Sequence, residues 1–279
     1  MQPIHTRIEI GLSSPIRVLH ASDTHLTHAD MRDGQRKVDL AESRLRGFPE
    51  ADQRLAELGK LSQELGLPIM HTGDLIDFVS LANLEAAKAF ADSHDIFMAT
   101  GNHEFSLYVG EAWEDADYRN QSLAAVQACY KNDIRMSARI IRNGNAALNF
   151  VALDNGYYYF EPQQLEFLKD QVALGLPVVL MMHTPLYERK LYDDARAHSG
   201  SCAYLAGVPD ELIADYDSYR YRQQKSDATT AEFLEYVAGE TAIKCILAGH
   251  LHVDYDSTFA GRIPQLISGG SVARVVEFC

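Results

Sequence analysis

Five short clusters of aspartate, histidine and asparagine stand out along this 279-residue chain, and three of them contain a glycine. In chain order they are Asp23-Thr24-His25, Gly73-Asp74, Gly101-Asn102-His103-Glu104, His183-Thr184-Pro185 and Gly249-His250-Leu251-His252. Carboxylate oxygens, amide oxygens and neutral imidazole nitrogens together suit divalent transition metals such as Mn, Fe, Zn and Ni better than Ca or Mg. If the clusters converge in space, they can therefore form a metal centre.

Each cluster closes a short apolar run that predicts a buried strand. These runs are residues 16–20, 68–72, 96–99, 177–182 and 242–247. Amphipathic stretches between them predict helices, and the clearest are residues 53–65, 81–93 and 162–174. This alternation indicates an α/β protein. Ligands of open α/β sheets bind beyond the carboxyl ends of the strands, so we expect the five clusters to meet there.

The composition and charge restrict the class of partner. The chain is 47% apolar and 23% charged, which is typical of a globular protein with a sizeable core. Its formal net charge is −14, from 39 acidic and 25 basic residues. A field of this sign repels nucleic-acid backbones and anionic membranes, so we expect neither as a partner. A small phosphorylated substrate is affected less, because bound cations outweigh the distant field.

Features of a secreted or membrane protein are not found in the sequence. The first ten residues have no apolar stretch of signal-peptide length, and the densest apolar run, residues 176–182, is too short to cross a bilayer. The four cysteines are widely separated, which indicates reduced thiols. No repeat or linker divides the chain, so we expect one cytoplasmic domain over residues 1–279.

The five clusters, in this order, resemble the motifs of the calcineurin-like metallophosphoesterase family, and the match runs from Asp23 to His252. The resemblance implies a four-layer α/β/β/α sandwich of the metallo-dependent phosphatase type, with two mixed sheets between outer layers of helices. It also implies two divalent metal ions and hydrolysis of a phosphomonoester or phosphodiester by a hydroxide that bridges them.

Seven residues match the metal ligands of the family. They are Asp23, His25 and His252 for one ion, Asn102, His183 and His250 for the other, and Asp74 for both. We expect Asp74 to bridge the ions because its carboxylate has two oxygens that can each face one cation. We interpret His250 and His252 as paired ligands on the same face of an extended segment.

His103 and Asp77 match positions of the family that lie off the metals. The resemblance implies that His103 protonates the leaving alkoxide or stabilises charge on the phosphate, and that Asp77 orients it. The protein-phosphatase branch has Arg-Gly after this aspartate, whereas Phe78-Val79 follow here. A small-molecule phosphodiesterase or phosphatase is therefore favoured over a protein phosphatase. A non-catalytic, metal-bound interaction scaffold on the same fold is the alternative of another class.

The segment of residues 186–225 has six tyrosines with arginines and lysines between them. It allows two interpretations of equal weight. In one it is a cap whose tyrosines stack on a substrate ring such as a nucleobase, and in the other it is a helical insertion whose tyrosines serve packing. Residues 105–133, with the only tryptophan, Trp113, are a candidate for the opposite wall of the cleft. We assign no role to His198.

Overall fold

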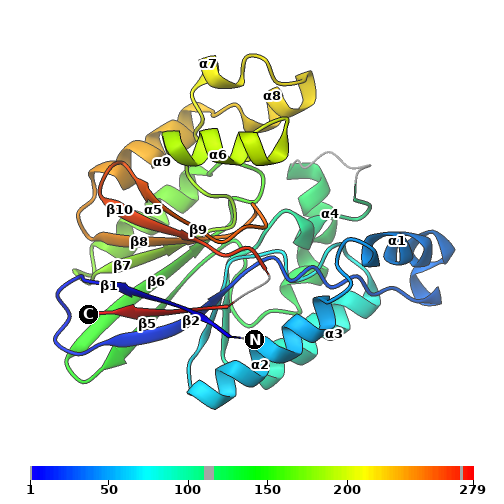
Figure 1. The fold of residues 1–279 in the computed structure, drawn as a ribbon, viewed down its shortest axis with the longest axis horizontal. Coiled ribbons are helices and arrows are strands. Elements are labelled where there is room, and N and C mark those ends of the chain that lie inside the picture. The colour runs from blue at the N-terminus through cyan, green and yellow to red at the C-terminus, as the bar shows by residue number, and fades with distance from the viewer. Residues whose placement is uncertain (1, 110–115, 271–272) are drawn as a thin grey trace.

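The computed structural model describes residues 2–109, 116–270 and 273–279. At its centre two β-sheets face each other across an apolar interface (Figure 1). The first sheet contains, in spatial order, β1 (Ile4–Ile8), β11 (Arg274–Phe278), β2 (Ile16–Ala21), β3 (Ile69–His71) and β4 (Ile96–Met98). The second contains β5 (Met136–Asn143), β6 (Ala146–Leu153), β7 (Val178–Met181), β8 (Ile243–Ala248), β10 (Ile263–Ile267) and β9 (Tyr255–Phe259). Both sheets mix parallel and antiparallel pairs.

Helices cover the outer face of each sheet (Figure 1). Beside the first sheet are η1 (Met31–Asp33), α1 (Gln35–Leu45), α2 (Ala51–Leu65), α3 (Leu81–Ser93), η2 (His103–Phe105) and α4 (Ala116–Gln127). Beside the second are α5 (Pro162–Val172), α6 (Arg189–Ser199), α7 (Asp210–Ile213), α8 (Ser218–Gln224) and α9 (Ala228–Gly239). The four layers confirm the predicted α/β/β/α sandwich. In the described parts of the chain, no helix has the length and apolar character needed to cross a membrane.

Local sequence explains why α2 and α3 form where the pattern predicts them. In α2, leucines recur at helical spacing from Leu55 onward and bury one face against the first sheet. The helix ends at Gly66, whose φ of 63° is the left-handed conformation that favours glycine. The α3 helix begins after Ser80, whose hydroxyl accepts a hydrogen bond from the backbone amide of Asn83 (3.0 Å). It spans the predicted residues 81–93.

The five strands predicted beside the polar clusters are all present, and each end lies within one residue of the prediction. They are β2, β3 and β4 in the first sheet and β7 and β8 in the second. The first three run parallel to one another, as do the last two. Because parallel strands end at the same sheet edge, each sheet brings its polar clusters together.

The segment of residues 186–225 forms α6, α7 and α8 with their connections, above the second sheet in Figure 1. Two of its tyrosines, Tyr192 and Tyr216, are buried in the apolar cluster that includes Phe233 of α9 and Ile246 of β8. For these two residues the contacts agree with the packing interpretation. Tyr204 differs, because it lines the pocket described below.

Candidate metal centre

The predicted metal ligands converge at one end of the sandwich, where the chain leaves β2, β3, β4, β7 and β8. Three groups of side chains in the described residues have ligand atoms that all lie within 4.8 Å of one another; one is His25, Asp77 and His103, and the other two share Asp74. Of the two that share Asp74, the first group is Asp23, His25, Asp74 and His252, and the second is Asp74, His183 and His250. Asn102, predicted for the second group, lines the same pocket as Asp74 and His250. The structure therefore brings six of the seven residues into two groups that share Asp74, and it places Asn102 in the pocket beside them.

The spacing of donor atoms in the first group suits a metal ion. Nε2 of His25 lies 3.0 Å from Nε2 of His252, 3.6 Å from Oδ2 of Asp74 and 3.8 Å from Oδ1 of Asp23. The same Asp23 oxygen is 3.5 Å from Nε2 of His252. Neighbouring ligands that bind one ion at about 2.1 Å lie roughly 3.0–3.4 Å apart, which is close to these separations.

Asp74 joins the two groups through one oxygen. Its Oδ2 atom lies 3.1 Å from Nε2 of His183, which is itself 3.1 Å from Nδ1 of His250. Oδ2 is also the atom nearest His25. Oδ1 instead accepts a hydrogen bond from the backbone amide of His103 (2.9 Å). In this structure Oδ1 is thus held by the backbone, and Oδ2 is the oxygen that faces both groups.

The backbone of the centre is held in an unusual conformation. Among the described residues, eight that are not glycine have a positive φ. They are Asp23, His25, Asp74, Tyr158, Tyr204, His250, His252 and Ala260. Five are candidate ligands, and the two tyrosines contact the His250 ring. Such conformations cost about 1–3 kcal/mol each and gather at functional sites.

The left-handed backbone also corrects the interpretation of the last motif. With φ values of 73° and 55°, His250 and His252 do not lie on an extended segment. The two side chains belong to different ligand groups, although they come from neighbouring positions of one loop. The loop turns at each histidine, and each side chain is thereby directed to its own group.

The outer nitrogens of three imidazoles are fixed by hydrogen bonds. Nδ1 of His183 donates to the backbone carbonyl of Thr72 (2.7 Å), and Nδ1 of His25 donates to Oδ1 of Asp77 (2.9 Å). A carbonyl only accepts, so in the neutral His183 ring Nε2 has no proton and faces Asp74. Nε2 of His250 lies 2.7 Å from the hydroxyl of Tyr158. Such partners fix ring orientation at metal sites.

Asp77 is fully buried and connects His25 to His103. Its Oδ1 atom lies 3.2 Å from Nδ1 of His103, and its backbone carbonyl accepts a hydrogen bond from that nitrogen (2.7 Å). Arg44 of α1 donates to both carboxylate oxygens (2.6 and 2.8 Å). Burial opposes ionisation, yet Arg44 and the two histidines hold the pKa of Asp77 well below its usual range. Asp77 thus orients His25 as well as His103.

Glu104 fastens two of the ligand loops together. Its buried carboxylate accepts hydrogen bonds from the backbone amides of Asp74 (2.8 Å), Leu75 (2.7 Å) and Gly101 (2.7 Å). Burial and the nearby Asp74 carboxylate raise the pKa of Glu104 to about 7. The backbone of Gly101 also lies so close to Asp74 that a Cβ atom at this position would overlap the Asp74 side chain. The glycine of this motif is therefore a steric requirement of the centre.

A sixth loop, after β6, supports the second group without supplying a ligand. Oδ1 of Asn155 accepts hydrogen bonds from the backbone amides of His183 and Thr184 (3.0 Å each), and its Nδ2 donates to the carbonyl of Thr184 (2.8 Å). A Cβ atom at Gly156 would lie 2.7 Å from the backbone nitrogen of Asn102. We did not predict this loop from the sequence, although Asp154-Asn155-Gly156 is also a polar cluster with glycine after an apolar strand.

The electrostatics of the centre fit a site for cations. Burial opposes ionisation of Asp74, yet His183 and His103 hold the pKa of this carboxyl well below its usual range. Burial disfavours the charged form of His183, but the Asp74 carboxylate raises the pKa of this ring to about 9. Asp74 and Asp77 likewise raise the pKa of His103 to about 10. The buried carboxylates thus hold positive charge beside them, which divalent ions also provide.

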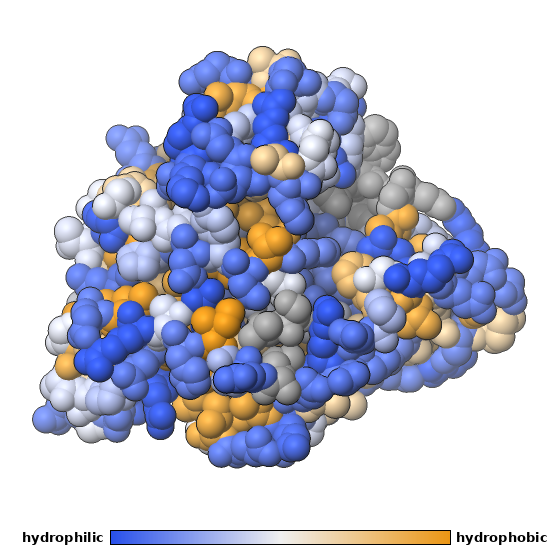
Figure 2. Space-filling model, viewed as in Figure 1, coloured by the Kyte–Doolittle hydropathy of each residue, from blue (hydrophilic) through white to orange (hydrophobic). Residues whose placement is uncertain are grey.

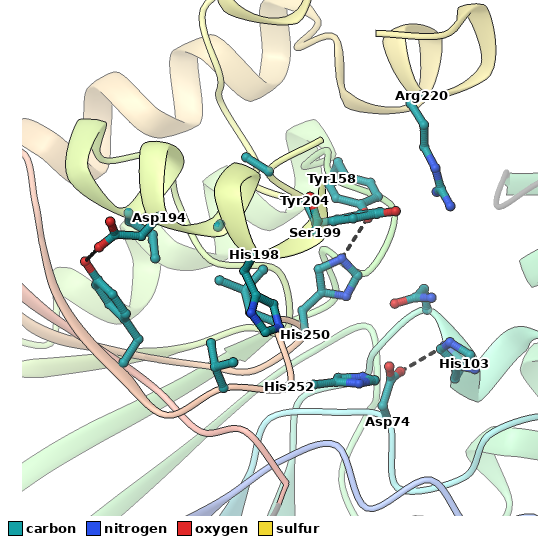
Figure 3. Close-up of a pocket in the computed structure, with 17 residues that line it drawn as sticks. Asp74, His103, Tyr158, Asp194, His198, Ser199, Tyr204, Arg220, His250 and His252 are labelled. Atoms are coloured by element: carbon teal, nitrogen blue, oxygen red, sulfur yellow. Dashed lines mark hydrogen bonds between the residues drawn. The ribbon is translucent and has the colours of Figure 1, made fainter. Parts of the chain in front are cut away.

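A pocket of about 620 Å³ opens above the two groups (Figure 3). Asp74, Asn102, His103, His250 and His252 form its floor. The walls come from α6, from Tyr158, Tyr204 and Arg220, and from the stretch Leu251–Val253 with Tyr255. Figure 2 shows apolar side chains beneath residues 186–225, bordered by hydrophilic ones.

Two sequence expectations concern the walls of this pocket. His198 of α6 lines it, although we assigned that residue no role. Trp113, considered for the opposite wall, lies outside the described residues. Of the wall residues, Arg220 belongs to the 186–225 segment that one interpretation makes a cap, whereas Tyr158 has no sequence signal because its place depends on contacts with distant parts of the chain.

Comparisons with known proteins give a matching family model and several similar solved structures. A family model described as calcineurin-like phosphoesterase matches residues 16–254. A dimetal phosphatase structure from Danio rerio is 14% identical, with a TM-score of 0.51, over 91% of this chain and 87% of that one. A Haemophilus influenzae NAD nucleotidase is 11% identical, with a TM-score of 0.47, over 95% of this chain and 47% of that one.

A calcineurin-like phosphoesterase, YfkN, from Bacillus subtilis is 14% identical, with a TM-score of 0.42, over 94% of this chain and 84% of that one. No curated protein sequence matches significantly. At these identities the likeness to solved structures shows the fold alone.

Proposed function

Because the chain belongs to the calcineurin-like phosphoesterase family, we propose that it hydrolyses a small phosphodiester or phosphomonoester with two divalent metal ions. The observation that carries the proposal is the pair of ligand groups that share Oδ2 of Asp74. Mn, Fe, Zn and Ni suit this mixture of nitrogen and oxygen donors.

In this proposal one ion would be held by Asp23, His25 and His252, and the other by Asn102, His183 and His250, with Asp74 shared between them. When bound, the two ions would lower the pKa of water to give a nucleophile at neutral pH, and they would stabilise the phosphate oxygens as Lewis acids.

His103 is the proton donor to the leaving group in this proposal. Its Nδ1 atom is occupied by Asp77, so Nε2 is the nitrogen that can serve the substrate. The ring lines the pocket beside Asp74 (Figure 3), and the nearby carboxylates favour its charged form. Asp77 positions His103 and also His25, so it links the proton donor to one ion site.

The pocket supports a small molecule over a phosphoprotein as substrate. A volume of about 620 Å³ is in the usual range for small-molecule sites, roughly 300–1,000 Å³. Helix α6 and Arg220 of α8 wall the space above the ligands. Phe78-Val79 follow Asp77, where protein phosphatases of the family have Arg-Gly.

His103 supports an enzyme over a non-catalytic, metal-bound scaffold. Five candidate ligands are in left-handed conformations, each at a cost of about 1–3 kcal/mol, and any metal centre at this place would need them. A scaffold has no need of a further histidine in the pocket beside the ligands, whereas hydrolysis needs a proton donor there.

The test of the proposal is metal-dependent hydrolysis. Purified protein, stripped and reloaded with Mn, is assayed with 4-nitrophenyl phosphate and bis(4-nitrophenyl) phosphate, with metal content measured by mass spectrometry. We expect two ions per chain and hydrolysis of at least one substrate that chelation abolishes. Protein that binds two ions and hydrolyses neither these compounds nor a panel of nucleotides and cyclic nucleotides would support the scaffold instead.

A further inference from the structure

An arginine reaches the pocket from a part of the chain far from the metal motifs. We propose that Arg220 of α8 is a substrate-binding residue, whose guanidinium holds the anionic oxygens of the phosphoester. This inference rests on the proposed function, since it names a residue that selects the substrate of the same site.

The position of Arg220 fits this role. Its side chain is partly buried and lines the pocket together with Asn102 and His103. Figure 3 shows the guanidinium pointing from α8 into the space above the floor, on the side of His103 and Asp74. An anion above the ligand groups thus has a cation on the side opposite to them.

Aromatic rings and the helix start orient the guanidinium. Its central carbon lies 5.0 Å from the ring centre of Tyr204 and 5.1 Å from that of Tyr219. Nη1 donates a hydrogen bond to Oε1 of Gln223 (2.6 Å). The backbone amide of Arg220 donates to the Asp217 side chain that caps α8 (3.0 Å). A planar guanidinium held over ring faces still presents N–H groups at its edge to oxygen acceptors.

Tyr204 couples this arginine to the metal centre. Its ring centre lies 5.9 Å from that of His250 and also contacts Arg220. Tyr204 has a φ of 56°, which is strained for a bulky residue. The strained Tyr204 ring therefore contacts both the candidate ligand His250 and Arg220, and it positions the guanidinium relative to the floor of the pocket. Neither Tyr204 nor Arg220 belongs to the metal motifs.

The remaining wall indicates where the organic part of the substrate lies. Leu191 and Ala195 of α6 face the pocket together with Leu251 and Val253. Asp194, His198 and Ser199 of the same helix also line the pocket, so polar groups stand beside this apolar surface. The ligand class is therefore a small phosphoester with its phosphoryl group between the ligand groups and Arg220, and with an organic group along α6 that carries both apolar surface and hydrogen-bonding atoms.

The experiment compares R220Q and R220K with the control R222Q. Arg222 is on the same helix, is exposed, and does not line the pocket in the described structure. Each Mn-loaded variant is characterised by kcat and KM for 4-nitrophenyl phosphate and by calorimetric affinity for inorganic phosphate. Metal content and the unfolding transition are recorded for every variant.

For R220Q we expect KM and the phosphate Kd to rise together by roughly ten- to hundred-fold, as for loss of a charged hydrogen-bonding pair, with two ions retained. R220K should lose less, because it keeps the charge without the planar fork. R222Q should match the wild type. Phosphate affinity and KM in R220Q equal to those of R222Q would overturn the assignment, as would wild-type protein that holds two ions and binds no phosphate.

The calorimetric arm separates this inference from the proposed function. Protein that binds phosphate through Arg220 yet hydrolyses no ester contradicts the proposed function alone. If the wild type hydrolyses the ester and R220Q binds phosphate with the same affinity as the wild type, only the inference about Arg220 is contradicted.

Discussion

The floor and the α6–α8 wall of the pocket are built in opposite ways. The floor consists of loops after buried strands, and its ligands are held by buried groups such as Glu104 and Asn155. The wall consists of short helices whose exposed faces carry ion pairs such as Arg189–Asp193 and Lys190–Asp194. Exposed pairs contribute little to stability, whereas buried hydrogen-bonded networks rigidify a site.

This contrast assigns chemistry to the floor and specificity to the wall. Ion binding demands donor atoms fixed to within a few tenths of an ångström, and the strained, buried floor provides that. Substrate choice tolerates a wall of lower local stability, which can also change without disturbing the ions. Substitutions in the floor should therefore affect metal content or turnover, and substitutions in the wall should affect the preference among substrates.

The largest effect is expected for Asp74→Ala. Because Oδ2 of Asp74 faces both ligand groups, both ions should be lost together and hydrolysis should fall by at least about a thousand-fold. Metal analysis after gel filtration measures this. The control is Asp95→Ala, which removes an exposed carboxylate paired with Arg139. A variant that retains two ions would show that the bridge lies elsewhere.

His103→Ala should retain both ions and lose about a hundred- to ten-thousand-fold in kcat, the usual contribution of a proton donor. The loss should grow as the leaving group becomes more basic, since a poor leaving group depends more on protonation. A series of substituted phenyl phosphates measures this slope. An unchanged slope, or full activity, would contradict the assignment of His103 as general acid.

Asn155→Ala should weaken the second ion more than the first. Its side chain holds the backbone of His183 and Thr184, and loss of such support typically costs ten- to a hundred-fold in metal affinity. Stepwise titration with Mn should then show one tight and one weakened site. Asn149→Ala is the matched control, because Asn149 is also buried but bonds Gln171. Equal weakening of both sites would contradict the separate support of the two groups.

Metal affinity should rise with pH. Although burial disfavours the charged ring, Asp74 raises the pKa of His183 from 6.5 to about 9 in the metal-free protein. The ring must lose that proton to bind an ion, so affinity should increase up to tenfold per pH unit below 9 for this proton.

The stability of the metal-free protein should change in the opposite sense. A raised folded-state pKa contributes stability that is full below 6.5 and is lost as the pH rises toward 9. Thermal unfolding of the metal-free protein as a function of pH measures this stability.

The proton of His183 can also be counted directly when Mn binds. Calorimetric titration of Mn into the metal-free protein, in two buffers of different ionisation enthalpy, gives the number of protons released. Release of no proton at pH 7 would contradict a charged His183.

Ala195→Phe is the smallest expected effect and addresses the wall. A larger side chain on α6 should lower kcat/KM by about three- to tenfold for phosphoesters with a bulky organic group and leave methyl esters unchanged. Ala197→Phe, on an exposed position of the same helix, is the control. Metal content should stay at two ions in both. A loss that is equal for small and bulky esters would contradict the placement of the organic group.

Sequence patterns predict the floor far better than the wall. Strands such as Ile16–Ala21 and ligands such as Asp74 follow from local signals, an apolar run that closes on a polar cluster with glycine. The partners of the ligands do not. Arg44 meets Asp77 across 33 residues, and Tyr158 meets His250 across 92, so only the assembled fold reveals them.

The tyrosines of the 186–225 segment show a second limit of structure prediction from sequence patterns. These tyrosines look alike in composition, yet Tyr192 is buried in the apolar cluster and Tyr204 faces the pocket. Backbone conformation decides between them, since Tyr204 has a left-handed φ that no pattern of residue types indicates. Asn155 could have been predicted, because it lies in a polar cluster with glycine after an apolar run, which is the signal that marks the other loops.

The most direct test of the two-ion centre is an anomalous difference map from crystals of the Mn-loaded protein. We predict two peaks about 3.5–4 Å apart, with Oδ2 of Asp74 between them. One peak should lie beside His25 and His252, and the other beside His183 and His250. A single peak, or two peaks that do not share Asp74, would contradict the account.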